Sequence, residues 1–444
     1  MEMRTRRRRG NTRLAGRSDT LWRVMGAPEM HPELLGVRLP PITFPSFRKM
    51  AESHLSSYFE TVSQGVQAGT ISFEKDEIPL FPTTAVFTRS PTHYVVELFG
   101  ARRRCGTLRS KLHTARSFSL IMEDFEYNGP TAYLLRPQPT SGPRRPSGFT
   151  NIAFVAQRTL HELEERFPGL RGLFKTSIVF TPEDVECIKW LDATPDLNYP
   201  IIISNCLVVN SLGNIVRARY INLFLVIPAE LETQEVINAL RETVRVQSDL
   251  PGVQIVNQGH QEAVAQAGQL ANLYLQGVHE TTLTQFLEDH SEIIQRALDA
   301  DQIFFQPLLA WREGNPDPTE IAIQPDIIMR RNDGQWYIID FKLPLLTKAS
   351  ITTGGHKRRR FIYTVADGVA QLHNYRVFFE HQANREAAVS TLGEEICDAQ
   401  LMLIAGTSEN VDLAEVDEAM RPLKPIEIVD YDTLIRMSVT KLNH

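Results

Sequence analysis

The spacing of apolar residues changes along the chain and divides it into a strand-rich part and a helix-rich part. Up to Pro228, apolar runs such as HYVVELFG and TSIVF have the length of single strands and are separated by turn residues. In residues 206–228, two apolar runs flank Ser-Leu-Gly-Asn at 211–214, which predicts a β-hairpin. Between Phe44 and Pro228 we therefore expect short strands joined by turns.

After Pro228 the apolar period becomes helical. The stretches AELETQEVINALRETVRV and EAVAQAGQLANLYLQG have the apolar spacing of two helices. A third helical stretch, TTLTQFLEDHSEIIQRAL, places five apolar residues on one stripe: Leu283, Phe286, Leu287, Ile293 and Ile294. A strand, a turn and a second strand then run to Phe341, followed by a helix around Gln371 and a strand at AQLMLIAG. This order of helices and strands predicts an α/β core.

The length of the chain, 444 residues, exceeds one ordinary core, so we expect two domains and a tail. Residues 1–40 are Arg-rich and then Pro-rich, which predicts a flexible tail, either a solvated arm or an arm that contacts phosphates. Residues 41–255 are expected to form a strand-rich α+β domain. Residues 256–444 are expected to form the α/β domain.

Charge and cysteine usage narrow the class of protein. Because the net charge is −6, contact with nucleic acid would have to come from local basic patches. The four cysteines show no C-x-x-C spacing, which argues against a disulfide framework or a zinc knuckle and favours a cytoplasmic protein. The apolar runs are too short for a membrane span, and no apolar segment follows the basic N-terminus, so we expect no membrane association and no secretory signal.

The charged residues that suggest a catalytic site lie in the stretch QPDIIMRRNDGQWYIIDFKLP. Asp326 opens one apolar strand, Asn-Asp-Gly at 332–334 predicts a hairpin turn, and Asp340 and Lys342 end the return strand. Since strand side chains alternate, Asp340 and Lys342 project to one face and Phe341 projects to the other, into the core. The hairpin folds Asp326 back toward Asp340, so two carboxylates and an ammonium group converge.

Two close carboxylates raise one another's pKa unless a cation lies between them. Mg²⁺ suits such a site, with Mn²⁺ as the alternative ion, because it prefers oxygen ligands and is often held by one or two carboxylates and a substrate phosphate. It could polarise a scissile phosphate and help to deprotonate water, while Lys342 would neutralise phosphate charge and orient the attacking water. The alternative is a buried salt bridge at a strand end.

These residues resemble the PD-(D/E)xK motif of the restriction-endonuclease-like fold, with P-D at Pro325-Asp326 and D-x-K at residues 340–342. Gln371 and Tyr375, four residues apart on one helical face, look like the accessory helix motif of many nucleases in this superfamily. The alternative is a polar pair on an amphipathic helix. The resemblance implies a mixed sheet flanked by helices at the C-terminus; the strand-rich α+β domain expected before it carries no such resemblance.

More specifically, the region resembles the Shedu anti-phage defence nucleases. The matching features are F-L-E-x-H at 286–290, the P-D pair, acidic-x-K-x-P at 340–344, a basic linker and Q-L-x-x-Y at 371–375. The resemblance covers residues 281–406. Position 340 is Asp where the family more often has Glu, and Ser291 stands where proline is expected.

The resemblance implies roles for the residues of the hairpin and of the accessory helix. Asp326 and Asp340 become metal ligands, with the Phe341 carbonyl as a further ligand. Lys342 becomes the catalytic lysine. Gln371 and the tyrosine four residues later would lie beside the active site.

The preceding helix offers two carboxylates for one role. Glu288 is a candidate for holding a metal ion or its bound water, the alternative being a solvated helix glutamate. Glu280 competes for the same role. His290 is expected to be a capping or packing residue.

A basic loop separates the second strand from the accessory helix. It contains Gly354-Gly355 and then Lys357, Arg358, Arg359 and Arg360. A nuclease needs cationic groups on the phosphates that flank the scissile one, so we expect this loop to contact phosphate. The alternative is a solvated charge run.

Taken together, the sequence predicts a Mg²⁺-dependent endonuclease that hydrolyses phosphodiester bonds, with DNA as the favoured substrate. The resemblance implies bacterial defence against phage, an N-terminal domain that regulates the nuclease, and a homo-oligomer, for which the family suggests a tetramer. The alternatives are a catalytically silent nucleic-acid-binding or assembly module, and a nuclease that cuts RNA or processes ends.

Overall fold

The computed structural model of the chain describes residues 40–116, 147–150, 152–156, 161, 177–181, 200–212, 215–244, 250–275, 279–317, 319–345, 348–355, 358–423 and 425–441. The expected N-terminal tail lies outside these ranges apart from Pro40, and so does Lys357 of the basic loop. Within these ranges, no helix combines the length and the apolar character that crossing a membrane requires.

The first described element is a long helix that the apolar pattern did not predict. Helix α2, Phe44–Gln67, begins after Thr43, whose side chain accepts a hydrogen bond from the backbone N–H of Ser46. It buries six side chains at helical spacing: Phe47, Ala51, Leu55, Tyr58, Phe59 and Val62. The strands and turns expected from Phe44 onward therefore begin only after this helix, whose period is readable in the sequence.

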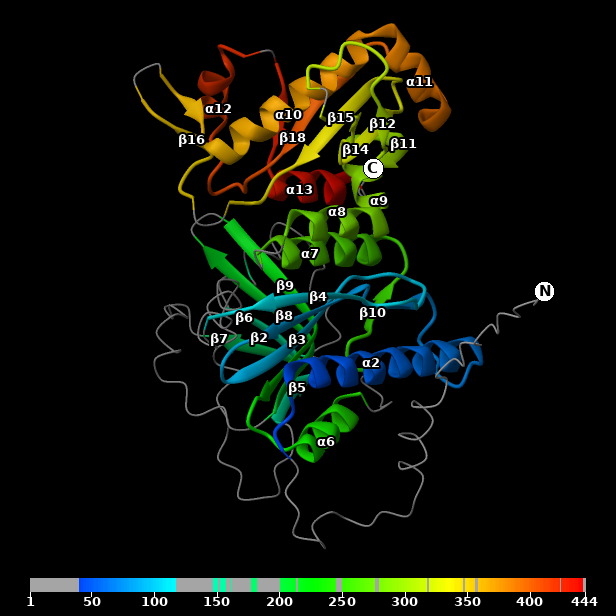
Figure 1. Cartoon of the computed structure of the whole chain (residues 1–444). Helices are drawn as coiled ribbons and strands as arrows, with labels where there is room; N and C mark the ends of the chain where they lie inside the picture. Colours follow the sequence, from blue (N-terminus) through cyan, green and yellow to red (C-terminus); the bar gives the residue numbers. More distant parts are fainter. Residues whose placement is uncertain are drawn as a thin grey trace, which may run out of the picture.

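The N-terminal sheet has the strand order β4-β2-β3-β9-β8-β6-β7, and β5 also pairs with β8. The strands are β2 Thr84–Arg89, β3 His93–Phe99, β4 Arg109–Thr114, β5 Ser147–Thr150, β6 Ile152–Ala156, β7 Ser177–Thr181, β8 Ile201–Leu212 and β9 Ile215–Pro228. The antiparallel register of β8 and β9, which ends at Leu212 opposite Ile215, confirms the predicted hairpin. Helix α2 and helix α6, Thr233–Thr243, bury an apolar cluster with β2, β3 and β9 (Figure 1).

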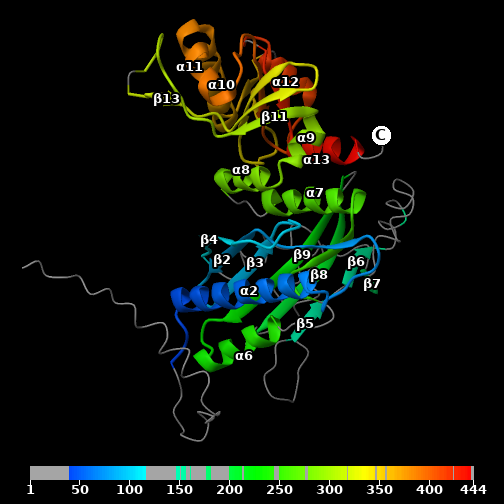
Figure 2. The same cartoon turned by 90° about the vertical axis from the view of Figure 1, so that its right-hand side faces the viewer.

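Helix α7, His260–Leu275, lies between the N-terminal sheet and the C-terminal elements (Figures 1 and 2). On one side Asn272 donates a hydrogen bond to the Tyr220 carbonyl at 2.5 Å. On the other side Leu270, Leu273 and Tyr274 belong to the core of the C-terminal part. Just before α7, strand β10, Gln254–Asn257, pairs with β1, Glu77–Leu80, and contains the boundary expected after residue 255.

The C-terminal part is a five-stranded mixed sheet with the order β11-β14-β15-β18-β19. Strands β11, β14 and β15 are antiparallel, whereas β15, β18 and β19 are parallel. Their bounds are β11 Ala300–Phe305, β14 Ile327–Arg331, β15 Trp336–Phe341, β18 Gln400–Ile404 and β19 Glu427–Val429. The pairing of Ile327 with Ile339 confirms the predicted hairpin. The chain therefore has the mixed α/β class that its pattern predicts.

Helices cover both faces of this sheet. They are α8 Glu280–Asp289, α9 Glu292–Leu298, α10 Tyr363–Glu380, α11 Gln382–Leu392, α12 Leu413–Met420 and α13 Tyr431–Thr440. Short strand pairs border the sheet: β12 Leu309–Ala310 with β13 Ala322–Ile323, and β16 Thr352–Thr353 with β17 Arg360–Phe361. Side chains of α7, α8, α9 and α13 form one core with the sheet, and those of α10, α11 and α12 form a second core (Figure 1).

The third helical stretch divides into α8 and α9 at His290, whose φ of −127° and ψ of 49° are not helical. In one continuous helix, Ile293 would follow Leu287 by six steps of about 100°, so the two side chains would point about 120° apart around the axis. The break instead returns Ile293 to the core that contains Leu287, and both are fully buried. The stripe was thus predicted correctly, but its continuity was not.

Candidate active site at the end of β15

The side chains of β15 alternate between the two cores, as predicted. Ile339 and Phe341 lie in the core under α8, α9 and α13, while Ile338 lies in the core under α10. Asp340 therefore faces α10, and Lys342 follows directly after the strand. The Lys342 N–H donates to the Ile404 carbonyl at 2.9 Å. This backbone contact with β18 fixes the lysine at the sheet end.

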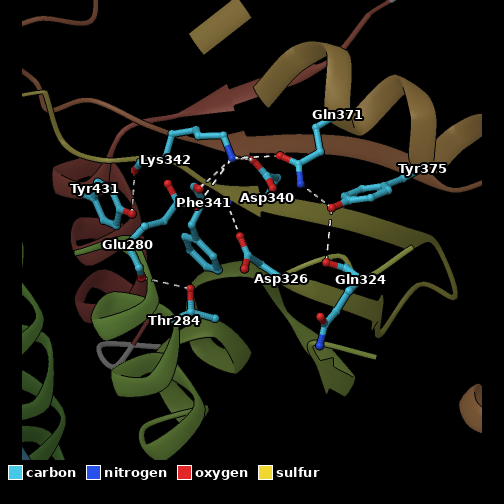
Figure 3. Close-up of polar contacts among 10 residues, drawn as sticks. All are labelled: Glu280, Thr284, Gln324, Asp326, Asp340, Phe341, Lys342, Gln371, Tyr375 and Tyr431. Atoms are coloured by element: carbon cyan, nitrogen blue, oxygen red, sulfur yellow. Dashed lines mark hydrogen bonds and ion pairs between the residues drawn. The ribbon is translucent and has the colours of Figure 1, made fainter. Parts of the chain in front are cut away.

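The Lys342 ammonium group is the centre of a cluster of oxygen atoms (Figure 3). Its Nζ lies 2.6 Å from Asp340 Oδ2 and 3.7 Å from Glu280 Oε1. It donates to Gln371 Oε1 at 3.1 Å and to the Phe341 carbonyl at 3.4 Å. The Lys342 side chain is only 8% exposed, so these oxygen atoms replace much of its water shell.

Asp326 joins the cluster from the neighbouring strand. Its Oδ2 accepts a hydrogen bond from the N–H of Phe341, the residue between Asp340 and Lys342, at 2.9 Å (Figure 3). The hairpin therefore does bring Asp326 to the end of β15. Asp326, Asp340 and Glu280 place three carboxyl groups around one ammonium group.

Burial and like charge perturb the protonation of this group. Burial raises the pKa of Asp340 to about 7; Lys342 opposes this rise, and the charges of Asp326 and Glu280 add to it. Burial also raises the pKa of Asp326 and of Glu280 above their ordinary values. Burial lowers the pKa of Lys342, but the combined effects of Asp340, Glu280 and Asp326 outweigh it and raise this pKa above its ordinary value. The Lys342 ammonium group is therefore charged at neutral pH. The three carboxyl groups around it either carry more negative charge than this one cation can neutralise or retain protons.

The donor set fits a hard divalent cation. Asp340 Oδ2 is buried and accepts no well-aligned hydrogen bond from the described residues, although it lies beside the ammonium group. The Asp326 carboxylate and the Phe341 carbonyl supply further oxygen atoms of the kind that Mg²⁺ prefers. Within the described ranges, no three acidic, histidine or cysteine side chains are gathered into a metal-binding group by themselves. The candidate donor set therefore consists of two carboxylates and one backbone carbonyl.

Of the two helix carboxylates, Glu280 lies at the site and Glu288 does not. Glu280 is the first residue of α8 and approaches Lys342. Glu288 is exposed, and eight residues of helix place it about 12 Å further along the axis. The local motif identified the correct helix but could not tell which of its ends meets the sheet.

The Gln371–Tyr375 pair on α10 contacts the cluster around Lys342. Gln371 Nε2 donates to the Tyr375 hydroxyl at 2.6 Å, and this hydroxyl donates to the Gln324 carbonyl at 3.3 Å (Figure 3). These two bonds orient the Gln371 amide so that its oxygen faces Lys342. Tyr375 itself is buried. A chain of hydrogen bonds therefore links α10 and the segment before β14 to the lysine.

Two residues that the sequence did not single out also hold the lysine in place. A Cβ atom on Gly368 of α10 would lie 2.9 Å from Lys342 Cε and 2.9 Å from Leu403 Cδ1, so only glycine leaves room for the lysine stem. The Tyr431 hydroxyl of α13 donates to the Lys342 carbonyl at 2.9 Å. A glycine inside a helical pattern can mark a close approach, but nothing local identified Tyr431.

His290 is a packing residue, as expected from the sequence. Its ring is 1% exposed and lies 4.4 Å from the Phe286 ring, measured between centroids. Its Nε2 accepts a hydrogen bond from the Ala101 N–H at 3.5 Å. The histidine thus joins the end of α8 to the N-terminal domain.

The basic loop is divided between structural and exposed charges. Arg359 lies 2.7 Å from Glu415 and 3.5 Å from Glu418 on α12, so it anchors the loop to the fold. Arg358 and Arg360 are exposed. Of the described arginines of this loop, these two leave their charge exposed to solvent.

Comparison with known proteins adds no identification. No protein-family model matches the chain, and a search of curated proteins finds no significant match. The chemistry of the cluster at the end of β15 is therefore the basis for assigning a function.

Proposed function

We propose that the chain is a Mg²⁺-dependent nuclease that hydrolyses phosphodiester bonds of DNA at a restriction-endonuclease-like active site. The observation that carries this proposal is the charged, buried Lys342 held among the carboxyl groups of Asp340, Asp326 and Glu280. A salt bridge that served only stability would need one carboxylate, and two further partly buried acids, Asp326 and Glu280, would destabilise it. A lysine surrounded by more carboxylates than it can neutralise suits a site that also binds a metal ion and a phosphate.

Asp340, Asp326 and the Phe341 carbonyl would hold the metal ion. When bound, Mg²⁺ polarises the scissile phosphate and lowers the pKa of a bound water molecule. The excess negative charge of the three carboxyl groups would then be balanced, and the buried Asp340 would no longer favour a proton.

The side chains of the chain supply the remaining chemistry. The Lys342 ammonium group, fixed by Gln371, binds a nonbridging phosphate oxygen and stabilises the charge that develops in the transition state. Glu280, whose side chain is 37% exposed, is open to solvent and can accept the proton of the attacking water at its carboxylate. The raised pKa of Glu280 makes it a better base than an ordinary glutamate.

The surroundings of the site support a nucleic-acid substrate. The mixed sheet with helices on both faces agrees with the expected nuclease fold. Arg358 and Arg360 offer exposed positive charge for flanking phosphates. The resemblance to Shedu nucleases supports the further proposals of a cytoplasmic anti-phage role, a homo-oligomer and regulation by the N-terminal domain.

The test is incubation of the full chain with linear, circular and single-stranded DNA and with RNA, in Mg²⁺ and in EDTA. We expect cleavage of DNA in Mg²⁺ only. Asp340→Asn should lower the rate at least about 100-fold. Asp398→Asn is the matched control, because Asp398 is exposed and precedes β18 at the opposite end of the sheet. No cleavage of any substrate would mean a silent module, and cleavage of RNA alone would overturn the assignment to DNA.

A further inference from the structure

A cavity of about 730 Å³ lies between the N-terminal domain and helices α7, α8 and α9. Its lining residues are Arg102, Arg103, Arg104, Gly259, Glu262, Ala263, Gln266, Asp289, His290, Glu292 and Arg296. This volume is in the range of small-molecule sites. The cavity adjoins the C-terminal end of α8, whereas Glu280 of the proposed active site is at the N-terminal end. It is thus a separate site.

Two bidentate ion pairs engage carboxylates of the cavity lining. Arg103 donates to both Glu262 oxygens at 2.5 and 2.6 Å. Arg109 donates to both Asp289 oxygens at 2.5 and 2.9 Å. Each pair joins the N-terminal domain to a helix of the α7–α9 layer. These contacts fix the shape of the cavity and neutralise two of its three carboxylates.

Two buried nitrogen atoms in this lining have no hydrogen-bond partner among the described residues. His290 Nε2 accepts from the Ala101 N–H, so Nδ1 carries the ring hydrogen, and Glu292 Oε1 lies 3.7 Å from it, beyond hydrogen-bond range. The second atom is Arg296 Nε, while Nη2 of the same side chain donates to Gln266 Oε1 at 3.3 Å. Both atoms are donors, so the missing partner is a hydrogen-bond acceptor.

The net charge of the lining also favours a ligand with negatively charged acceptor atoms. Once the two wall pairs are set aside, Arg102, Arg104 and Arg296 remain against the single carboxylate of Glu292. Arg104 is exposed, and Arg102 is half-buried. The lining is therefore positive and rich in donors.

We propose that this cavity binds a small phosphorylated ligand of about the size of a nucleotide. Phosphate oxygens accept hydrogen bonds without donating any, which matches the unfilled donors, and their negative charge matches the remaining arginines. A cavity of this volume leaves room for more than a single phosphate ion. The proposal does not depend on the nuclease assignment, because none of the lining residues belongs to the cluster around Lys342.

The test is isothermal titration calorimetry of the full chain with ATP and with inorganic pyrophosphate, in low salt and EDTA so that no metal ion is present. We expect both probes to bind. The double variant Arg102→Ala/Arg104→Ala should weaken binding at least about tenfold. Arg89→Ala/Arg116→Ala is the charge-matched control, since both side chains are exposed and lie outside the lining.

The outcomes separate this site from the proposed active site. Asp340→Asn should bind both probes like the wild type, because Asp340 does not line the cavity. Absence of binding by both probes at millimolar concentration would overturn the proposal. Equal loss of affinity in both double variants would also overturn it, because it would indicate general attraction to positive charge.

Discussion

Binding of Mg²⁺ to Asp340 should require the loss of a proton near neutral pH. Because burial raises the pKa of this carboxyl group to about 7, it is about nine-tenths ionised at pH 8 and about one-tenth ionised at pH 6. A metal ligand must be deprotonated, so the apparent Kd for Mg²⁺ should rise about tenfold from pH 8 to pH 6. This corresponds to about 1.4 kcal/mol of binding free energy. The raised pKa values of Asp326 and Glu280 act in the same direction.

Titration calorimetry with Mg²⁺ at pH 6, 7 and 8 measures this dependence. Repeating each titration in two buffers with different ionisation enthalpies gives the number of protons released. We expect about one proton from Asp340 at pH 6 and about a tenth of a proton at pH 8. Asp340→Asn should lose the binding, and Asp398→Asn should keep both the affinity and its pH dependence. Equal Kd values at pH 6 and pH 8 with no proton release would refute the reasoning.

Two further predictions concern the packing around the site and the basic loop. Gly368→Ala should lower the free energy of unfolding by about 1–3 kcal/mol in a urea titration, because its Cβ would overlap the lysine stem; Gly268→Ala, in a helix with open space around it, should stabilise instead. Replacing Arg358 and Arg360 with Ala should flatten the dependence of log K on log salt by about two for DNA binding. Arg359→Ala should leave that slope unchanged, and equal slopes in all three proteins would return the loop to a solvated charge run.

The hairpin at the centre of the site could be predicted because its information is local. Alternating apolar residues, the Asn-Asp-Gly turn and the positions of Asp326, Asp340 and Lys342 determine which side chains share a face. The same is true of Gln371 and Tyr375, whose spacing places both on one side of α10. In each case the repeat of the strand or helix is enough to determine which side chains lie on the same face.

The errors lie where tertiary contacts decide. Which end of α8 approaches β15 depends on the packing of the helix layer, so the motif around Glu288 could not reveal that Glu280 is the nearer carboxylate. The cavity depends on pairs such as Arg109 with Asp289, which are 180 residues apart in the chain. Helix α2 is different, because its apolar period was present in the sequence and was outweighed by the strand-like runs that follow it.

The most direct test of the nuclease assignment is the rate of cleavage of linear double-stranded DNA in Mg²⁺ by Lys342→Met beside the wild type. Methionine keeps much of the apolar stem but removes the ammonium group that Asp340 and Gln371 hold. We predict a rate at least about 100-fold lower, with DNA binding within about twofold of the wild type. A Lys342→Met protein that cleaves at the wild-type rate would contradict the assignment of the active site to the end of β15.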